Sequence, residues 1–406
     1  MRPFLASPFD VTTLRRGITL KARHRSSGLN SRFLGEPTFA EYVQRTRDML
    51  YQFHLRSASA DLERVVEGNA PFELIPSAVG TAGKQKTYRR GILLTHGLSD
   101  SPYFMKYLAG FFQMNGFRVM AILLPGHGTQ PGDLLDVRWQ DWSDAVAYGT
   151  ERLSEEVDEI YLGGYSAGAT LSVNQSLYDD RVRGLFLFSP AFKISGRAAL
   201  ANLHKLYSWL IPSAMWVDIK PDLDIYKYES FPKNAATQMY ALTKAVGAKL
   251  RESGVVIPVF AAASVDDSTV DPLATLHFID CVRHPSCKLV FYTTNVSIFS
   301  SEIAAGKIEL VNSKFPEQKI LSFAHTSIVI SPCDEHYGMK GSYSNCIHYY
   351  PDQMEKFSAC LKYPERDNQG EITGRNLQSG ILRRLMYNPN IDELKISMQQ
   401  FMDSLN

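Results

Sequence analysis

The chain has 406 residues, 45% hydrophobic and 21% charged, a globular composition with enough apolar residues for a substantial core, which excludes disorder as its dominant state. Its formal charge is only +1, so no overall field favours nucleic acid or an anionic membrane surface as a partner. The longest apolar run, residues 255–263, is interrupted by Pro258 and is too short to cross a bilayer, so we expect no integral membrane span.

The five cysteines give no sign of a disulfide framework, because their number is odd and none of them belongs to a CxxC pair. All five lie in the last third of the chain, close to His284, His336 and His348, and this grouping raises a zinc site as one interpretation. Scattered buried thiols are the simpler interpretation and the one we adopt. We therefore expect a reducing compartment, the cytoplasm, and no metal.

The first 35 residues are strongly basic, with seven Arg and Lys residues against the single acid Asp10. They lack the apolar segment of a secretory signal, and Pro3, Pro8 and Gly17 interrupt any amphipathic helix. A transit peptide has a similar composition, but we favour an extended arm that lies on the body or extends away from it.

The first helix is expected to begin at Thr38, because Thr38 and Glu41 have the spacing of a capping box. The residues that follow place mostly apolar side chains on one face, namely Phe39, Tyr42, Val43, Thr46, Met49, Leu50 and Phe53. That face must pack against the rest of the protein.

From residue 90 onward, apolar runs of strand length alternate with helical patterns, which is typical of a parallel sheet flanked by helices. The expected strands are residues 91–95, 118–124, 159–165 and 184–188. The expected helices are residues 103–114, a segment with Trp139, Trp142, Val146 and Leu153 on one face, and one that begins near Ala167. The fold class is therefore predicted to be α/β.

The alternation stops between residues 193 and 254, where helical and irregular sequence predicts an insertion. Further strands are expected at residues 255–263, 288–294 and 319–325, and a final helix carries Ile391, Leu394, Met398, Phe401 and Leu405 on one stripe. We predict four parts: an N-terminal arm and helix (1–75), a first core part (76–192), a cap insertion (193–254) and a second core part (255–406).

Residues 164–168 read GYSAG, a GxSxG pattern that directly follows an apolar strand and precedes a helical pattern. A serine on such a sharp strand-to-helix turn has a strained backbone and an exposed hydroxyl, and the flanking glycines leave room for the neighbouring strand and helix. Ser166 is therefore the candidate nucleophile. The alternative is a serine that only caps a helix at a glycine-rich turn.

Four segments in this order resemble the α/β-hydrolases of the carboxylesterase and monoacylglycerol-lipase type: GILLTHGLSDSPYFM (91–105), VMAILLPGHGTQPGD (119–133), YLGGYSAGAT (161–170) and SVDDSTVDP (264–272). The resemblance is close over about residues 90–192 and depends on short motifs beyond them. It implies an α/β-hydrolase fold, a mostly parallel central sheet flanked by helices, with a helical cap insertion. In that family the turn at His96 and Gly97 presents a backbone N–H, so Leu98 and Ala167 are the expected oxyanion-hole donors.

The catalytic acid should follow the serine at a later strand end, because the chain order in this fold is Ser, Asp, His. Asp266 and Asp267 both qualify, and the resemblance aligns the family's acid with Asp267. Both could also be ordinary turn residues.

His325 is the candidate base, because it ends the expected strand 319–325 and precedes a loop. It lies farther from Asp267 than the family pattern has it, with an extra strand between them. His336 and His348 remain alternatives in a loop, whereas His277 and His284 fall in a helical pattern. His96 is expected to brace its own loop.

Together these residues predict two-step acyl transfer by a serine ester hydrolase, without a cofactor. Apolar residues of the insertion, among them Tyr207, Trp209 and Trp216, would roof a pocket for the acyl group of a small-molecule ester, although ordinary packing of the insertion explains them as well. Transient contact with lipid is possible through the same residues. A thioesterase, an acyltransferase or a non-catalytic binding protein of the same fold stays open, as does the oligomeric state.

Overall fold

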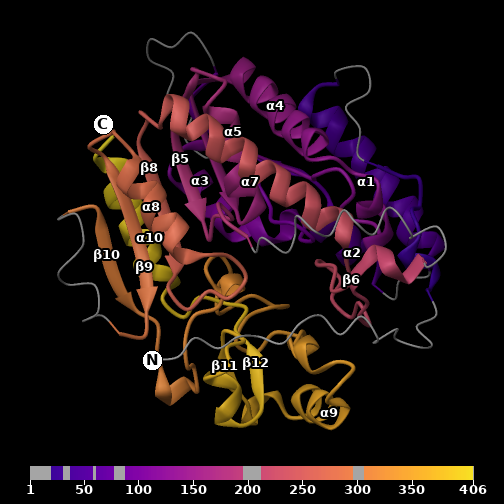
Figure 1. Ribbon diagram of the computed structural model, residues 1–406. Helices are drawn as coiled ribbons and strands as arrows, with labels where there is room; N and C mark the ends of the chain where they lie inside the picture. Colours follow the sequence, from indigo (N-terminus) through magenta and orange to yellow (C-terminus); the bar gives the residue numbers. More distant parts are fainter. Residues whose placement is uncertain are drawn as a thin grey trace.

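The structure, a computed structural model, describes residues 20–30, 37–57, 61–76, 87–194, 212–295 and 306–405. Its centre is an eight-stranded sheet with the order β1-β3-β2-β4-β5-β8-β9-β10 (Figure 1). β1 runs antiparallel to β3, and the other neighbouring pairs are parallel. The strands are β1 (Phe72–Leu74), β2 (Tyr88–Thr95), β3 (Phe117–Ile122), β4 (Val157–Tyr165), β5 (Val182–Phe188), β8 (Val259–Ser264), β9 (Cys287–Thr293) and β10 (Ile308–Asn312).

The sheet separates two hydrophobic cores, because successive side chains of a strand point to opposite faces. On β2, Leu93 belongs to one core, while Ile92 and Leu94 belong to the other. Helices cover both faces, as Figure 1 shows. One face carries α3 (Lys106–Met114) and α10 (Ile391–Asp403); the other carries α4 (Trp139–Glu156), α5 (Ala167–Ser176), α7 (Lys233–Ser253) and α8 (Pro272–Cys281). This arrangement confirms the predicted α/β class.

The predicted strand at residues 319–325 is wrong. Ile320 forms only isolated bridges, with Phe315 and Gln369, and Lys319 has a left-handed backbone with φ 56°, which interrupts an extended run. The sheet instead ends in β10, which pairs with β9. His325 therefore does not end a strand; it begins a 3₁₀ turn, η8 (His325–Ser327).

The predicted capping box at the first helix is confirmed in α1 (Phe39–Arg56), where Thr38 and Glu41 exchange backbone-to-side-chain hydrogen bonds. Phe39, Tyr42 and Leu50 are buried, as the apolar face requires. A second helix, α2 (Leu62–Asn69), packs beside α1. This pair covers the edge of the body near β3, where the Tyr42 hydroxyl and the Leu123 backbone N–H lie 3.0 Å apart.

The described part of the basic arm, residues 20–30, lies on the body. Asn30 accepts a hydrogen bond from the Gly126 N–H at 2.6 Å, and the Ser27 hydroxyl donates to Asp133 at 2.8 Å. It contains a 3₁₀ turn, η1 (Ala22–His24), in which His24 is buried. Residues 1–19 lie outside the described residues.

Of the predicted insertion, residues 193–194 and 212–254 are described. They contain η5 (Pro212–Met215) and the antiparallel strands β6 (Trp216–Asp218) and β7 (Phe231–Pro232), followed by α7. Because α7 packs along α4 and α5, its apolar side contributes to the core of the sheet. The described part of the insertion that lies outside this core is therefore short.

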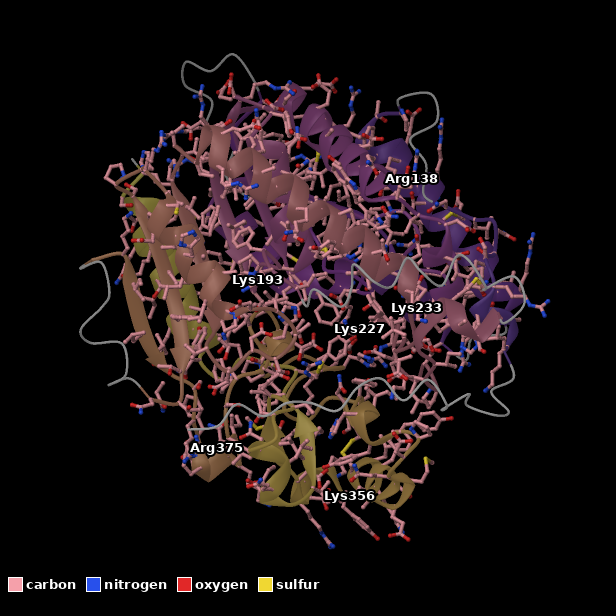
Figure 2. All side chains as sticks on the ribbon, in the orientation of Figure 1. Arg138, Lys193, Lys227, Lys233, Lys356 and Arg375 are labelled. Carbon is pink, nitrogen blue, oxygen red and sulfur yellow. A yellow bond between two sulfur atoms is a disulfide. The ribbon has the colours of Figure 1, made fainter. Side chains whose placement is uncertain are left out.

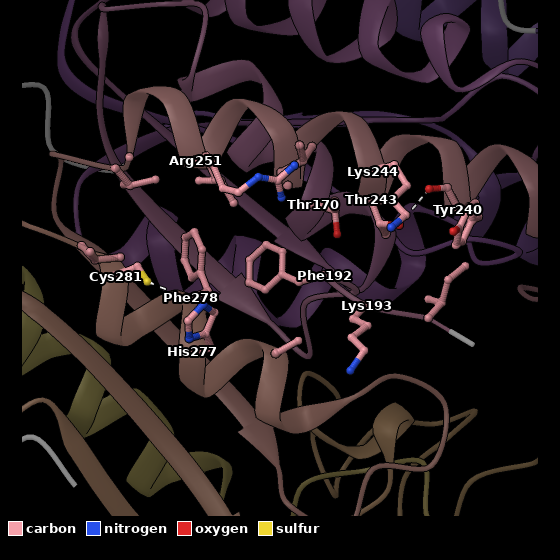
Figure 3. Close-up of a pocket in the computed structure, with 18 of the residues that line it drawn as sticks. Thr170, Phe192, Lys193, Tyr240, Thr243, Lys244, Arg251, His277, Phe278 and Cys281 are labelled. Carbon is pink, nitrogen blue, oxygen red and sulfur yellow. Dashed lines mark hydrogen bonds between the residues drawn. The ribbon is translucent and has the colours of Figure 1, made fainter. Parts of the chain in front are cut away.

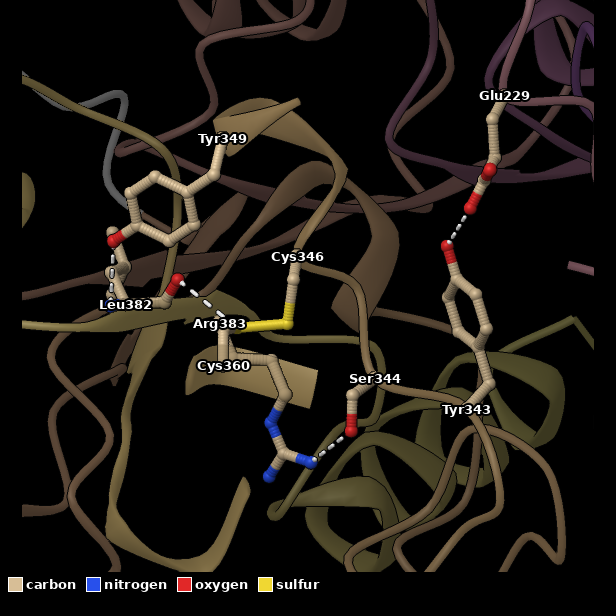
Figure 4. The surroundings of a disulfide bond; sticks show 8 residues. All are labelled: Glu229, Tyr343, Ser344, Cys346, Tyr349, Cys360, Leu382 and Arg383. Carbon is tan, nitrogen blue, oxygen red and sulfur yellow. Dashed lines mark hydrogen bonds between the residues drawn. A yellow bond between two sulfur atoms is a disulfide. The ribbon is translucent and has the colours of Figure 1, made fainter. Parts of the chain in front are cut away.

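Residues 331–386 form a layer beside the sheet, at the bottom of Figure 1, which we call the C-terminal layer. It contains α9 (Met354–Lys362) and two short parallel strands, β11 (Asn368–Gly370) and β12 (Leu382–Arg384). Cys346 and Cys360 are joined by a disulfide here (Figure 4). The expectation that the cysteines are scattered thiols is wrong for this pair, because the fold brings two cysteines 14 residues apart to bonding distance.

Within the described segments, the helices are all too short or too polar to cross a membrane.

Candidate active site

Ser166 lies on the sharp turn between β4 and α5, with φ 54° and ψ −113°. Backbone hydrogen bonds to β5 hold the turn, because the Ser166 N–H donates to the Phe188 carbonyl at 2.8 Å. A Cβ on Gly164 would lie 2.3 Å from the backbone of Gly168, and a Cβ on Gly168 would lie 2.1 Å from the Thr95 carbonyl. Glycine is therefore required at both positions, as the GxSxG pattern predicts.

The structure brings Ser166, Asp267 and His325 together in one line of contacts. His325 Nε2 lies 2.9 Å from Ser166 Oγ, and His325 Nδ1 lies 2.6 Å from Asp267 Oδ2. The three residues are buried, with Ser166 9% exposed. With Asp267 ionised, Nδ1 carries the proton and Nε2 is free to accept one from the serine hydroxyl. Their roles in catalysis stay a prediction.

The surroundings of Asp267 favour the ionised form of its carboxyl group. Its Oδ1 accepts hydrogen bonds from the backbone N–H groups of Thr269 at 2.8 Å and Val270 at 3.1 Å. Burial alone raises the pKa of the Asp267 carboxyl, but the facing His325 and these hydrogen bonds outweigh burial, so its pKa lies below the ordinary value. Burial raises the pKa of the neighbouring Asp266, which makes no contact with His325 in the described contacts.

The backbone of His325 is held from two sides. Its carbonyl accepts hydrogen bonds from the Ser189 hydroxyl at 3.1 Å and the Tyr165 hydroxyl at 3.3 Å, both on strand ends beside Ser166. Its N–H donates to Glu371 Oε2 at 2.9 Å. The sequence analysis missed Glu371, because a lone glutamate in an irregular segment belongs to no motif.

The other histidines make contacts of their own. His96 is buried between the Leu124 N–H, which donates to its Nε2 at 3.0 Å, and the Gly97 carbonyl, which its Nδ1 approaches at 2.8 Å. These two contacts link the end of β2 to the end of β3, which is the bracing expected of His96. His336 Nε2 lies 3.1 Å from Asp224 Oδ1. Burial lowers the pKa of the His348 ring to about 4.

The backbone N–H of Ala167, which follows Ser166, and that of Leu98, in the loop after β2, have no acceptor among the described contacts. The loop that carries Leu98 is fixed by the Lys227 ammonium, which lies in the middle of the molecule in Figure 2 and contacts Asp100 and the Ser99 hydroxyl. Burial raises the pKa of Asp100, and the Lys227 charge opposes this effect. The role of Leu98 and Ala167 as oxyanion donors stays a prediction.

The predicted substrate-binding residues are only partly described. Tyr207 and Trp209 lie outside the described residues. Trp216 is buried on β6, and its ring packs against that of His24 with centroids 5.1 Å apart. Its contact with the N-terminal arm supports ordinary packing as readily as a place in a pocket.

A cavity of about 780 Å³ opens between α7 and α8 (Figure 3). Phe192 and Phe278 contact each other in it as a tilted ring pair with centroids 4.4 Å apart, and Lys244 and Arg251 line its α7 side. Its described lining reaches Thr170, one turn of α5 beyond Ser166, but includes none of Ser166, Asp267 and His325. This cavity is therefore separate from the line of contacts at the serine.

Groups of three or more His, Cys, Asp or Glu side chains arranged to hold a metal ion are absent from the described ranges. Of the predicted zinc candidates, Cys346 is in the disulfide, and both ring nitrogens of His348 lack a hydrogen-bond partner among the described residues.

Comparison with known proteins connects this site with hydrolases. A thermostable monoacylglycerol lipase of Bacillus sp. (strain H-257) is 29% identical over 184 residues, which cover 45% of this chain and 72% of that protein. A structure of the metagenome-derived lipolytic enzymes LipS and LipT is 20% identical, with a TM-score of 0.46 over 61% of this chain and 88% of that chain. A soluble variant of monoglyceride lipase from Saccharomyces cerevisiae is 15% identical, with a TM-score of 0.42 over 57% of this chain and 83% of that chain.

The family described as "Serine aminopeptidase, S33" matches residues 86–295, just over half of the chain. The matched range contains Ser166 and Asp267 and ends before His325. The mostly parallel sheet, flanked by helices and bearing the GxSxG turn at the end of β4, is the α/β-hydrolase fold. The chain belongs to the Hydrolase_4 (serine aminopeptidase, S33) family of α/β-hydrolases.

Proposed function

We propose that the protein is a serine hydrolase that cleaves carboxylic esters through an acyl-enzyme on Ser166. The observation that supports this most directly is the line of contacts from Ser166 Oγ through His325 to Asp267, at 2.9 and 2.6 Å. His325 Nε2 takes the proton of the serine hydroxyl as Oγ attacks the ester carbonyl, and Asp267 stabilises the imidazolium that forms.

The carbonyl oxygen becomes negatively charged during the attack, and the Leu98 and Ala167 N–H groups stabilise this charge. Collapse of the tetrahedral intermediate breaks the ester C–O bond, and His325 gives its proton to the leaving alcohol. A water molecule, deprotonated by His325, then attacks the acyl-enzyme and releases the acid, and the proton returns to Ser166. Every step uses side chains of this chain and water.

The proposed substrates are small-molecule acyl esters of the monoacylglycerol type. The 29% identical lipase supports this class, and the apolar residues of the insertion, with Tyr207, Trp209 and Trp216 as its proposed substrate-binding members, would roof the acyl group. The same apolar residues provide transient contact with a lipid surface. The insertion at 193–254 would then act as the cap of the site.

The proposed location is the cytoplasm, and the Cys346–Cys360 disulfide argues against it, because such bonds persist mainly in oxidising compartments. Acid quenching of intact cells, followed by alkylation of free thiols under denaturing conditions, tests the location. A cytoplasmic enzyme would carry five alkylated cysteines, and an enzyme of an oxidising compartment would carry three.

The test of the nucleophile uses a fluorophosphonate probe on the wild type, Ser166→Ala and Ser176→Ala. Ser176 is a matched control, because it lies on the same helix and its hydroxyl only bonds the Val173 carbonyl. We expect one label per chain in the wild type and in Ser176→Ala, none in Ser166→Ala, and a loss of kcat of about 10⁴–10⁶ in Ser166→Ala. Labelling that survives in Ser166→Ala would contradict the assignment.

The test of the substrate class measures kcat/KM for p-nitrophenyl esters of increasing chain length, a monoacylglycerol, an acyl thioester and an aminoacyl p-nitroanilide. We expect the esters to be the best substrates. Because serine chemistry alone does not fix the bond that is cleaved, a preference for the anilide would assign peptidase activity, and transfer of the acyl group to added alcohol would assign an acyltransferase. Absence of both labelling and turnover would assign a binding role.

A further inference from the structure

Glu371 is a buried carboxylate that contacts the backbone of the proposed base. Its side chain has no exposed surface. Oε2 accepts the His325 N–H at 2.9 Å, and Oε1 accepts the Ile372 N–H at 2.7 Å and Arg384 Nη2 at 2.6 Å. All three donors face the two carboxylate oxygens, and the Arg384 guanidinium pairs with this buried group.

The same nitrogen of Arg384 also contacts the loop of the proposed acid. Nη2 donates to Thr269 Oγ1 at 2.7 Å, and the Thr269 N–H donates to Asp267 Oδ1 at 2.8 Å. The guanidinium therefore joins two segments that are far apart in the sequence, one carrying Asp267 and the other leading through Glu371 to His325.

Arg384 itself is fixed by the C-terminal layer. It lies on β12, which pairs with β11 directly before Glu371, and its backbone N–H donates to the Asn345 carbonyl at 2.9 Å. Burial alone lowers the pKa of Arg384, but Glu371 outweighs burial and raises it, so the guanidinium stays charged.

We propose that Glu371 and Arg384 are positioning residues of the active site, which set the relative placement of His325 and Asp267; this rests on the proposed function. His325 begins a 3₁₀ turn and lacks the ladder of hydrogen bonds that a strand would supply. The Glu371 carboxylate replaces that ladder with one charge-assisted hydrogen bond to the His325 N–H. Because a misplacement of about 1 Å can cost about 10² in rate, a small shift of this turn should lower kcat.

The test compares Arg384→Lys with Arg118→Lys in the full-length enzyme. Arg118 is a matched control, because it is also a buried arginine that pairs with carboxylates, Glu73 and Glu156, at the opposite end of β3 from the site. Lysine keeps the charge in both variants, but its side chain is one bond shorter and does not bring a nitrogen to the position of Nη2, which contacts both Glu371 and Thr269. Kinetics use a p-nitrophenyl ester, and far-UV circular dichroism with thermal unfolding measures the fraction of folded protein.

We expect Arg384→Lys to lower kcat by about 10²-fold with KM changed by less than about 3-fold, and Arg118→Lys to leave kcat unchanged even where its melting temperature falls. Thr269→Val, which removes only the hydroxyl bound by Arg384, should lower kcat by about 10-fold at the wild-type melting temperature. Glu371→Gln should lower kcat more than Glu371→Asp. Glutamine has an NH2 group in place of one carboxylate oxygen, and this group cannot accept a hydrogen bond from the donors that face it.

Wild-type kcat in both Arg384→Lys and Thr269→Val would overturn the proposal, as would losses of kcat that match the loss of folded protein. Equal losses of kcat in Arg384→Lys and Arg118→Lys would also overturn it, since they indicate an effect of stability alone. A wild-type enzyme that neither reacts with the probe nor hydrolyses the ester would instead overturn the proposed function, and the positioning role with it.

Discussion

Ser166 is held by backbone hydrogen bonds between regular elements, whereas His325, which begins a 3₁₀ turn, is held largely by side chains from distant parts of the chain. The serine turn joins β4 to α5, and the Ser166 N–H donates to the backbone of β5. The glycine at 168 lies so close to the end of β2 that no side chain would fit there. The histidine turn is bound by Tyr165, Ser189 and Glu371.

This difference means that the two halves of the site should fail in different ways. The serine half depends on close backbone approach, so added volume should damage it. The histidine half depends on charges and hydroxyl groups, so loss of a single polar atom should damage it while the fold survives.

The largest effect is expected for Asp267→Asn in the histidine half. The amide keeps the shape but can present a donor to His325 and favour the wrong ring tautomer, so kcat should fall by about 10⁴. Asp266→Asn is the neighbouring control and should keep wild-type kcat. Steady-state kinetics at saturating ester, with melting temperatures for both variants, checks this. Similar losses of kcat in Asp267→Asn and Asp266→Asn would mean that the effect comes from a disturbed loop and not from the lost contact with His325.

The next effect is expected for Gly168→Ala in the serine half. The added Cβ would lie 2.1 Å from the Thr95 carbonyl, so the backbone of β2 must move. We expect the free energy of unfolding to fall by about 1–3 kcal/mol and kcat by about 10². Gly110→Ala on α3 is the control: its Cβ would meet nothing within 4 Å, so it should gain about 0.5–1 kcal/mol. Denaturant unfolding and kinetics of both variants test the contrast.

The sequence predicts the serine half well because its signals are local. The strands around Gly91, Arg118 and Gly184 follow from apolar runs, and the turn at Ser166 follows from the spacing of its glycines. These patterns reflect geometry over a few neighbouring residues, which each segment determines for itself.

The histidine half could not be predicted in the same way. The expected strand that ends at His325 is absent, and the contacts that fix the turn come from Glu371, 46 residues away in the sequence. Contacts between distant side chains leave no periodic pattern. The Cys346–Cys360 pairing was missed for the same reason, since the connectivity of cysteines cannot be deduced from their spacing.

A smaller effect on activity is expected for Cys346→Ser. The disulfide closes a loop of 14 residues, so its loss should lower the free energy of unfolding by about 3 kcal/mol. Because Asn345, next to Cys346, binds the Arg384 N–H, kcat should also fall, by about 3-fold. Reductant should lower the stability of the wild type and not that of Cys346→Ser. The exposed Cys333 gives the control Cys333→Ser, and an equal change there would rule out the disulfide as the cause.

The smallest effect is a pH dependence in the serine half. The neutral ring of His127 accepts the Ser99 N–H at 3.0 Å, beside Leu98, and burial lowers the pKa of His127 from 6.5 to about 4. At pH values between about 4 and 6.5, the His127 ring binds a proton in the unfolded chain but not in the folded protein. The free energy of unfolding therefore falls as the pH falls. The loss should be about 2 kcal/mol between pH 6.5 and 5.

Unfolding free energies of the wild type and His127→Gln at both pH values isolate this contribution, since glutamine removes the titrating ring and can still accept the Ser99 N–H. The slope of the unfolding free energy against pH should decrease in His127→Gln. An unchanged slope in His127→Gln would show that the ring is protonated equally in the folded and unfolded protein.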